Sequence, residues 1–112
     1  MSAAIDLTLA ALADPTRRRV IELLRERPRP AGELAAAFAI TPPAMSRHLR
    51  LLRTRGLVDE RRDETDSRLR IYALRREPFD ALHEWLREIE GMWTEQLDAF
   101  AAHVDAIGRR ER

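Results

Sequence analysis

The segment 41–55 carries hydroxyl and guanidinium side chains at a spacing that suits contact with nucleic-acid bases. With about 100° between successive residues of a helix, one face of the segment collects its apolar side chains, namely Met45, Leu49 and Leu52. Arg47 lies on the opposite face, with Ser46 beside it. A guanidinium presents parallel donors that match the acceptors on the major-groove edge of guanine, and a hydroxyl donates to a base or a phosphate. The pattern predicts a helix that reads a DNA major groove, with Arg47 as the main base contact.

Other basic side chains of this region suit the DNA backbone. Arg50 and Arg53 follow on the same helix, and Arg62 and Arg68 lie in the segment after it. Phosphate contacts of this kind position a protein without reporting sequence. His48 falls between the two helix faces, so it is interpreted as a packing or phosphate-contacting residue rather than a base reader. Several acids lie among the arginines and would repel phosphate or pair with a neighbouring arginine: Asp59, Glu60, Asp63, Glu64 and Asp66. The alternative for the whole arginine set is a solvated helix face.

Two helices joined by a tight connection must position these side chains. A short helix is expected over 31–38, where apolar residues recur at helical spacing. Thr41 is suited to cap the second helix. Pro42 and Pro43 fall in its first turn, where missing N–H groups cost little. This arrangement predicts a helix-turn-helix over residues 31–55.

Two strands are expected after the second helix. Residues 57–62 form one strand, and residues 69–73 form another that alternates between apolar and polar side chains. The face of the second strand that is expected to be buried consists of Leu69, Ile71 and Ala73. Arg70 and Tyr72 are then expected on the outer face. The pair predicts a hairpin wing over 57–74.

Two helices are expected before the helix-turn-helix. Residues 3–13 carry apolar residues at helical spacing. A new helix begins after Asp14, a favourable N-cap, with Pro15 at its first position. Three arginines at 17–19 lie near its N-terminal end, which is unfavourable for cations on dipole grounds. They are interpreted as a phosphate contact or a solvated face.

A last helix is expected over 78–107, where apolar residues recur at steps of three and four. It would be roughly 45 Å long, whereas a compact domain of this size is about 26–30 Å across. A second copy of the chain is therefore expected to cover its apolar stripe, giving a two-fold dimer through the first and last helices. The alternatives are a helix that folds back over its own core or breaks near Gly91. The expected interface residues are Ile5, Leu9, Leu12, Trp85, Ile89, Trp93, Leu97 and Phe100.

Composition sets limits on the protein class. The 112 residues, 45% of them hydrophobic, suffice for a single domain over 1–112. The absence of cysteine excludes disulfides, thiolate metal sites and cysteine nucleophiles. No apolar run reaches membrane-spanning length and no basic secretory signal is present, so a soluble cytoplasmic protein is expected. The net charge of +1 is unevenly spread, with ten arginines and five acids over 41–76, but one arginine and eight acids over 77–107. The basic part coincides with the predicted DNA reader.

Several blocks stand in an order and spacing that resemble one known family. They are residues 11–18, 32–35, 43–49, 52–53 and 56–58. On these blocks, about residues 5–105 resemble the ArsR-type (arsenic-repressor-like) winged-helix family. The resemblance implies a homodimeric bacterial transcriptional regulator, usually a repressor, that binds an inverted-repeat operator through the helix 41–55. The predicted fold is mainly α with a small β-hairpin: a winged helix-turn-helix of about five helices and a two-stranded wing, dimerising through its first and last helices.

The resemblance also bears on the site residues. The family's base-contact positions fall on Pro42, Pro43, Ser46 and Arg47, so hydrogen-bonded readout would depend on the last two. Together with the pattern above, the residues expected to bind DNA are Thr41, Pro42, Pro43, Ser46, Arg47, His48, Arg50, Arg53, Arg62 and Arg68.

This chain differs from the metal-sensing members of the family in the residues at their ligand positions. Some place cysteines beside the helix equivalent to 31–38, where this chain has none. Others use histidine and carboxylate ligands on the last helix, but His83 and His103 are about 30 Å apart along one helix. The chain therefore resembles the metal-independent branch, and no cofactor is expected. The alternatives are a metal site shared by these two histidines across a dimer, and an unidentified small-molecule inducer bound near Trp85 and Trp93.

Two other function classes compete with a DNA-binding regulator. A winged helix can serve as a protein–protein interaction module, such as an anti-activator, without specific DNA binding. The uneven charge argues against that alternative. An enzyme is not expected, because Ser46 and His48 point to different faces of one helix and cannot form a nucleophile–base pair.

Overall fold

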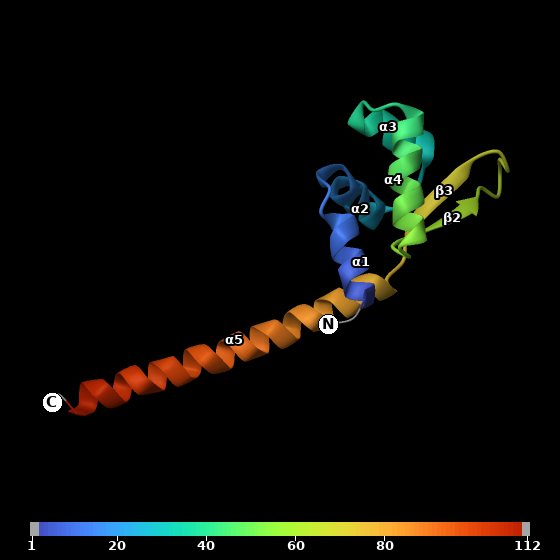
Figure 1. Ribbon diagram of the computed structural model, residues 1–112. Coiled ribbons are helices and arrows are strands. Elements are labelled where there is room, and N and C mark those ends of the chain that lie inside the picture. Colours follow the sequence, from blue (N-terminus) through green and yellow to red (C-terminus); the bar gives the residue numbers. More distant parts are fainter. Residues whose placement is uncertain (1–2, 111–112) are drawn as a thin grey trace. The chain divides into compact units, whose positions relative to one another are not determined.

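The computed structural model describes residues 3–110, and within them five helices and three strands. Their bounds are α1 Ala3–Leu12, α2 Pro15–Glu26, β1 Arg29–Pro30, α3 Ala31–Phe38, α4 Pro42–Thr54, β2 Val58–Arg62, β3 Arg70–Leu74 and α5 Glu77–Arg110. The chain divides between Asp80 and Ala81 into an N-terminal unit and a C-terminal unit. In the N-terminal unit, α3 packs beside α4, and the β2–β3 hairpin follows α4 as a wing (Figure 1). The predicted winged helix-turn-helix fold is confirmed.

The helix α2 begins as the sequence predicts. The Asp14 carboxylate accepts a hydrogen bond from the backbone N–H of Arg17 at 3.0 Å, and Pro15 occupies the first turn. This hydrogen bond, more than any other effect, lowers the pKa of Asp14 below its usual value. The helix α1 before it ends at Leu12, close to the predicted boundary.

The three arginines near the start of α2 make contacts within the N-terminal unit, although Arg18 and Arg19 remain exposed, as a solvated face requires. Arg17 Nε donates to the carbonyl of Ala11 at 2.7 Å, and Arg18 Nη1 donates to the carbonyl of Leu12 at 3.0 Å. Both guanidiniums therefore satisfy the carboxyl end of α1, where a helix dipole favours cations. The Arg19 guanidinium lies 5.0 Å from the centre of the Phe38 ring, within cation–π range. Their positions are explained within the N-terminal unit, without a phosphate.

The core of the N-terminal unit lies between the helices and the sheet. Its largest fully buried side chains are Val20, Leu34, Met45, Leu49, Leu52, Leu57 and Val58. The α4 stripe predicted from helical spacing thus forms the centre of this core. Burial of these side chains is what fixes the rotation of α4 about its own axis, because an apolar face removed from water is strongly favoured.

The sheet has one strand more than the sequence predicts. Its order is β1-β3-β2, with antiparallel pairing throughout, and Arg29 of β1 lies opposite Tyr72 of β3. Pro30 lacks an N–H donor, but β1 is an edge strand, where a proline is tolerated. The Arg29 side chain holds this strand by donating to the carboxylates of Glu26 and Glu33. The two-stranded wing is therefore part of a three-stranded sheet.

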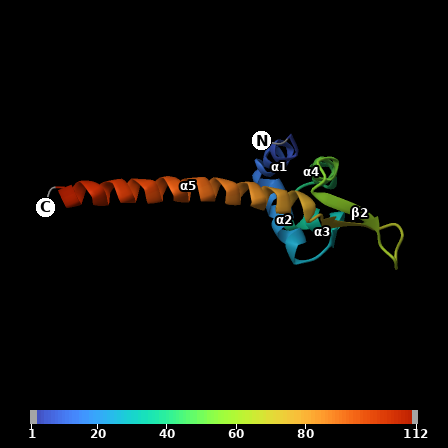
Figure 2. The same cartoon turned by 90° about the horizontal axis from the view of Figure 1, so that it is seen from below.

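The predicted faces of β3 are wrong in two places. Leu69 precedes the strand and is 43% exposed, whereas Tyr72 is buried among the core residues. Tyr72 and Ala73 are consecutive residues of β3 and both are buried, so simple alternation between inner and outer residues fails. Seen from below, the turn between β2 and β3 projects beyond this sheet (Figure 2).

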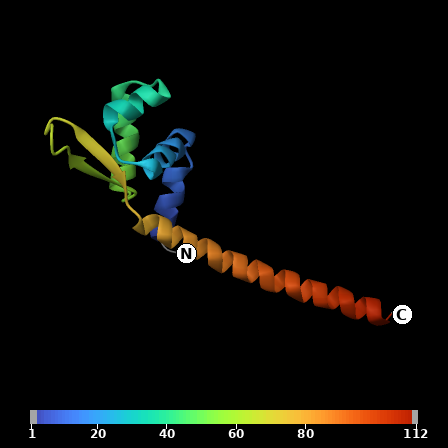
Figure 3. The same ribbon diagram turned by 180° about the vertical axis from the view of Figure 1, so that it is seen from behind.

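The C-terminal unit consists of the α5 residues from Ala81 onward. The helix is continuous through Gly91, so the alternative of a break there is wrong (Figure 3). It contains no buried residue, and large apolar side chains stay open to solvent, including Met92 and Trp93 at 62% and Phe100 at 65%. Among residues 3–110, no helix combines the length and apolar character needed to cross a membrane.

Candidate nucleic-acid interface

The helix α4 has two chemically opposite faces. Thr41 Oγ1 accepts the backbone N–H of Ala44 at 3.3 Å, and Pro42 and Pro43 lie in the first turn, where a missing N–H costs little. Met45, Leu49 and Leu52 are each at most 1% exposed. The side chains of Ser46, Arg47, Arg50 and Arg53 are exposed. The helix therefore packs and presents its polar groups as the spacing predicts.

Two arginines of the exposed face are unengaged. Among residues 3–110, the guanidiniums of Arg47 and Arg50 make no hydrogen bond or ion pair with another side chain or with the backbone. Each presents several donors to solvent. An anionic or acceptor-rich ligand meets these groups without first displacing a protein partner.

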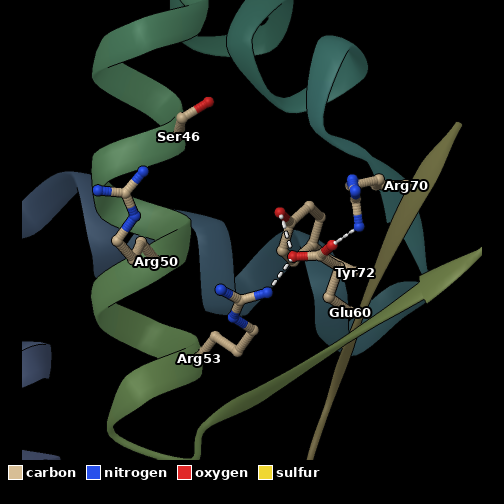
Figure 4. A pocket seen from close by; sticks show the side chains of 6 residues that line it. All are labelled: Ser46, Arg50, Arg53, Glu60, Arg70 and Tyr72. Carbon is tan, nitrogen blue, oxygen red and sulfur yellow. Dashed lines mark hydrogen bonds and ion pairs between the residues drawn. The ribbon is translucent and has the colours of Figure 1, made fainter. Parts of the chain in front are cut away.

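Arg53, one turn further along α4, is engaged by the wing. Its Nη1 donates to Oε2 of Glu60 on β2 at 2.5 Å, and Arg70 of β3 donates to Oε1 of the same carboxylate (Figure 4). The Tyr72 hydroxyl donates to Oε2 at 3.1 Å. Three donors from α4 and β3 thus converge on one side chain of β2, which is only 11% exposed.

The ionisation of this cluster follows from its contacts. Burial raises the pKa of Glu60, but the hydrogen bonds from Arg70 and Tyr72 and the charges of Arg70 and Arg53 outweigh it, so the pKa lies below its usual value. Burial, and then the bond to Glu60, raise the pKa of the Tyr72 hydroxyl. Glu60 is therefore a carboxylate and Tyr72 a neutral donor at neutral pH.

A recess lies between α4 and the wing, next to this cluster. Its volume is about 290 Å³, and its lining consists of Ser46, Arg50, Arg53, Glu60, Arg70 and Tyr72 (Figure 4). Three guanidiniums against one carboxylate give it a positive balance. A polar, positively charged recess beside a helix with free arginines suits a DNA backbone better than an apolar ligand.

Comparisons with known proteins agree with this geometry. A sequence model of the helix-turn-helix domain matches residues 12–61. The HTH-type transcriptional regulator Rv2034 of Mycobacterium tuberculosis is 36% identical over 103 residues, which cover 92% of this chain and 91% of that protein. The crystal structure of an ArsR-family transcriptional regulator superposes with a TM-score of 0.73 at 33% identity, covering 81% of this chain and 97% of that one. The chain belongs to the ArsR family of transcriptional regulators.

Another relative is named as a repressor. The transcriptional repressor SdpR of Bacillus subtilis is 36% identical over 52 residues, which cover 46% of this chain and 58% of SdpR. The family membership makes this chain a DNA-binding transcriptional regulator, as the sequence predicts.

The wing tip of this ArsR-family chain is organised by its own acids. The Asp63 carboxylate accepts hydrogen bonds from the Thr65 hydroxyl and the Asp66 backbone N–H, and these bonds lower its pKa. Arg68 Nε donates to Asp66 at 3.2 Å, although the arginine side chain remains 89% exposed. Arg62, at the end of β2, is exposed and lies opposite Arg70. Of the two wing arginines expected to contact phosphates, Arg68 is thus already paired.

His48 of this regulator is half-buried, between the core and the exposed face of α4. It follows the exposed Arg47 and precedes the buried Leu49 along the helix. This position suits packing more than base reading.

The residues expected at a dimer interface differ in their exposure. Ile5 is buried and Leu12 packs against the core, whereas Leu9 is 38% exposed. On α5, Trp85 is half-buried, while Ile89, Trp93, Leu97 and Phe100 are exposed. The apolar surface that the described chain leaves open therefore lies mainly on α5.

Of the two residues of the recess that β2 and β3 contribute beside Arg70, the sequence is misleading for Tyr72 alone. Tyr72 is expected on the outer face of its strand but is buried. Glu60 pairs with Arg53 and Arg70, which is one of the two interpretations that the sequence leaves open for the wing acids. The structure brings Glu60 and Tyr72 together because they are register partners in the β2–β3 ladder. The one sequence signal that could have found them is the pairing of a wing acid with neighbouring arginines, which was foreseen only in general terms.

Among residues 3–110, no three histidine, aspartate or glutamate side chains gather closely enough to hold a metal ion. His83 and His103 lie on the same helix, far apart along its length. This finding concerns a single chain.

Proposed function

We propose that this ArsR-family chain is a homodimeric repressor that inserts α4 into the major groove of an inverted-repeat operator. The observation that carries the proposal is the exposed face of α4, where Arg47 and Arg50 are free while the opposite face is fully buried. Arg47 reads a guanine, and Ser46 donates to a neighbouring base or phosphate. Arg50 and Arg53 contact the backbone.

The remaining site residues have lesser roles in the proposal. Thr41, Pro42 and Pro43 stand at the N-terminal end of α4 and approach the groove with it. Arg62 and Arg68 contact flanking phosphates, Arg68 after release from Asp66. His48 is a packing residue or contacts a phosphate, and it reads no base.

Dimerisation is supported by the apolar stripe of α5. Exposed large apolar residues continue along it from Leu86 to Ile107, which is more than a monomer leaves open to water without a partner. Leu7 and Leu9 of α1 are also exposed. A second copy that covers these side chains gives a two-fold dimer. Its two α4 helices then read half-sites about 34 Å apart, or one helical turn.

Repression is favoured by the likeness to SdpR, and we infer that the protein acts in the cytoplasm.

The proposal includes no cofactor, no metal and no catalytic step. Ser46 is exposed and His48 half-buried on different sides of α4, so they do not form a nucleophile–base pair. The domain that binds DNA comprises the helix-turn-helix and the wing, and α5 serves dimerisation.

Arg47→Ala tests the proposal, with Arg25→Ala as its control. Arg25 is an exposed arginine of α2, so both variants lose the same charge. The operator is first selected from a random duplex library, and binding is then measured by fluorescence anisotropy. Arg47→Ala is expected to weaken operator binding about 10- to 100-fold and to relax preference at one base pair per half-site. Arg25→Ala is expected to change it less than about threefold.

The contrary results are equally specific. If both variants bind the operator alike, Arg47 is not the base reader. If the wild-type protein selects no sequence and its weak DNA binding hardly depends on salt, the winged helix is a protein-interaction module instead.

A further inference from the structure

Glu60 is an acid in a surface whose other charges attract DNA. Its contacts explain why an acid stands at this position. We propose that Glu60 is a positioning residue for DNA binding, whose carboxylate holds Arg53 of α4 and Arg70 of β3 beside the recess so that both meet backbone phosphates. The inference rests on the proposed function, in which α4 and the wing face DNA.

Side chains of α4 and β3 lie on the two sides of the recess. Ser46, Arg50 and Arg53 follow each other at steps of four and three, so they form one strip along α4. Arg70 and Tyr72 are two residues apart and share one face of β3. Figure 4 shows the strip and the β3 face on either side of the recess, with the Glu60 carboxylate between the two guanidiniums. One side chain of β2 therefore links α4 to β3.

Glu60 differs from the neighbouring acid of β2, Asp59, in its exposure and its contacts. Asp59 is 57% exposed, and its only ion pair among the described residues is a 3.7 Å contact to Arg75. Glu60 is 11% exposed, and both of its oxygens accept hydrogen bonds. An acid that served only to balance surface charge would not need this burial or these three donors.

Arg53 and Arg70 keep free N–H donors although each is bonded to Glu60. Glu60 takes one nitrogen of each guanidinium, which leaves the other donors of Arg53 and Arg70 for phosphate oxygens. The pair carries a net charge of +1 after Glu60 is counted. A long side chain that is already held in place loses less conformational entropy when it binds. Tyr72 ties the carboxylate to the core, because its ring is buried and its hydroxyl donates to Oε2.

The opposite role for Glu60 predicts an opposite result. If its carboxylate merely occupied the two arginines, its removal would free them, tighten DNA binding and steepen the dependence on salt. If it positions them, its removal loses phosphate contacts and makes the dependence shallower. The direction of the change in salt dependence therefore separates the two roles.

The experiment compares Glu60→Gln with Asp59→Asn, which removes the same charge from the next residue of β2. Binding of the full-length protein to its selected operator, and to scrambled duplex, is measured by anisotropy at several salt concentrations. Glu60→Gln is expected to reduce the slope of log K against log salt by about one to two and to weaken operator binding about tenfold. Asp59→Asn is expected to leave the slope unchanged. An equal or steeper slope for Glu60→Gln would overturn the inference.

Two further variants separate positioning from a general loss of structure. Tyr72→Phe keeps the buried ring but removes the hydroxyl, and it is expected to give a smaller change in the same direction. In an Arg53→Ala, Arg70→Ala background, Glu60→Gln is expected to have no additional effect, because it acts through those two residues. An undiminished effect there contradicts the inference. Arg47→Ala in the same assay distinguishes the failures: if it weakens operator binding about 10- to 100-fold while Glu60→Gln matches Asp59→Asn, only the role of Glu60 is wrong.

Discussion

The N-terminal unit and the α5 residues beyond Asp80 differ in how far their apolar side chains are buried. In the N-terminal unit, Leu34, Leu49 and Leu52 are fully buried. Along α5, Trp93, Leu97 and Phe100 are more than half exposed, although they recur at the same helical spacing. A regular apolar stripe thus does not imply a core within its own chain. The N-terminal unit buries its apolar side chains within itself, whereas the open stripe of α5 is the surface that the proposed dimer covers.

The largest expected effect comes from polar substitutions in the α5 stripe. Leu97→Ser with Phe100→Ser is expected to weaken dimerisation by about 100-fold or more. Large apolar side chains of this kind, once an interface buries them, supply most of its binding free energy. Operator binding falls with dimerisation, because two linked recognition helices bind far more tightly than one. Sedimentation equilibrium measures the dimer, and anisotropy measures the DNA affinity.

The control places serine on the other side of the same helix. Ala102→Ser lies away from the Leu97–Phe100 stripe and is expected to leave both measurements unchanged. If the wild-type chain is monomeric at all accessible concentrations, the proposal that a second copy covers the apolar stripe of α5 is wrong.

A smaller effect is expected from pH, and it concerns the N-terminal unit. The pKa of Glu60 in the folded chain lies below its ordinary value of 4.5. The stability that this carboxylate contributes is complete above that value and is lost as the pH falls through the lowered folded value. Unfolding by urea at pH 6 and near pH 3.5 is therefore expected to show a smaller loss of stability for Glu60→Gln than for the wild-type protein. Equal losses would mean that Glu60 is not held as described.

The two regions can be followed separately in that experiment. Both tryptophans, Trp85 and Trp93, lie in α5 beyond Asp80, whereas Tyr72 lies in the N-terminal unit. Fluorescence of the tryptophans depends on protein concentration if α5 is dimeric. The tyrosine signal is expected to follow the acid transition of the N-terminal unit.

The smallest expected effect is a change in stability when a residue of the turn between α3 and α4 is replaced by glycine. Ala39 has a φ of 53°, in the left-handed region that favours glycine. Ala39→Gly is expected to stabilise the protein by about 0.5–1 kcal/mol, which thermal unfolding detects. Ala36→Gly, inside α3, is expected to destabilise it by a similar amount. Destabilisation by both variants would contradict the assigned turn geometry.

Local chemistry explains which elements could be predicted from the sequence. The starts of α2 and α4 depend on Asp14, Pro15, Thr41 and the prolines that follow, all close in sequence to the helices they begin. The buried stripe of α4 follows from helical spacing alone. These features need no knowledge of distant residues, so they were predicted correctly.

The errors concern contacts between distant residues. The strand β1 exists because Arg29 and Pro30 pair with Tyr72 and Ile71, and no local pattern reports such a register. The hydrogen bond between Tyr72 and Glu60 depends on the register of β2 with β3, which brings together two residues 12 apart in the sequence. Arg17 and Arg18 were judged against their own helix, whereas the structure places them on the carbonyls of α1.

The most direct test of the central claim is selection of DNA from a random duplex library by the wild-type protein and by Arg47→Ala. The account predicts that the wild-type protein enriches an inverted repeat with half-site centres about 10 base pairs apart, and that Arg47→Ala no longer enriches a guanine at one position of each half-site. Enrichment of no sequence, of a single unpaired site, or of the same repeat by both proteins would contradict the account.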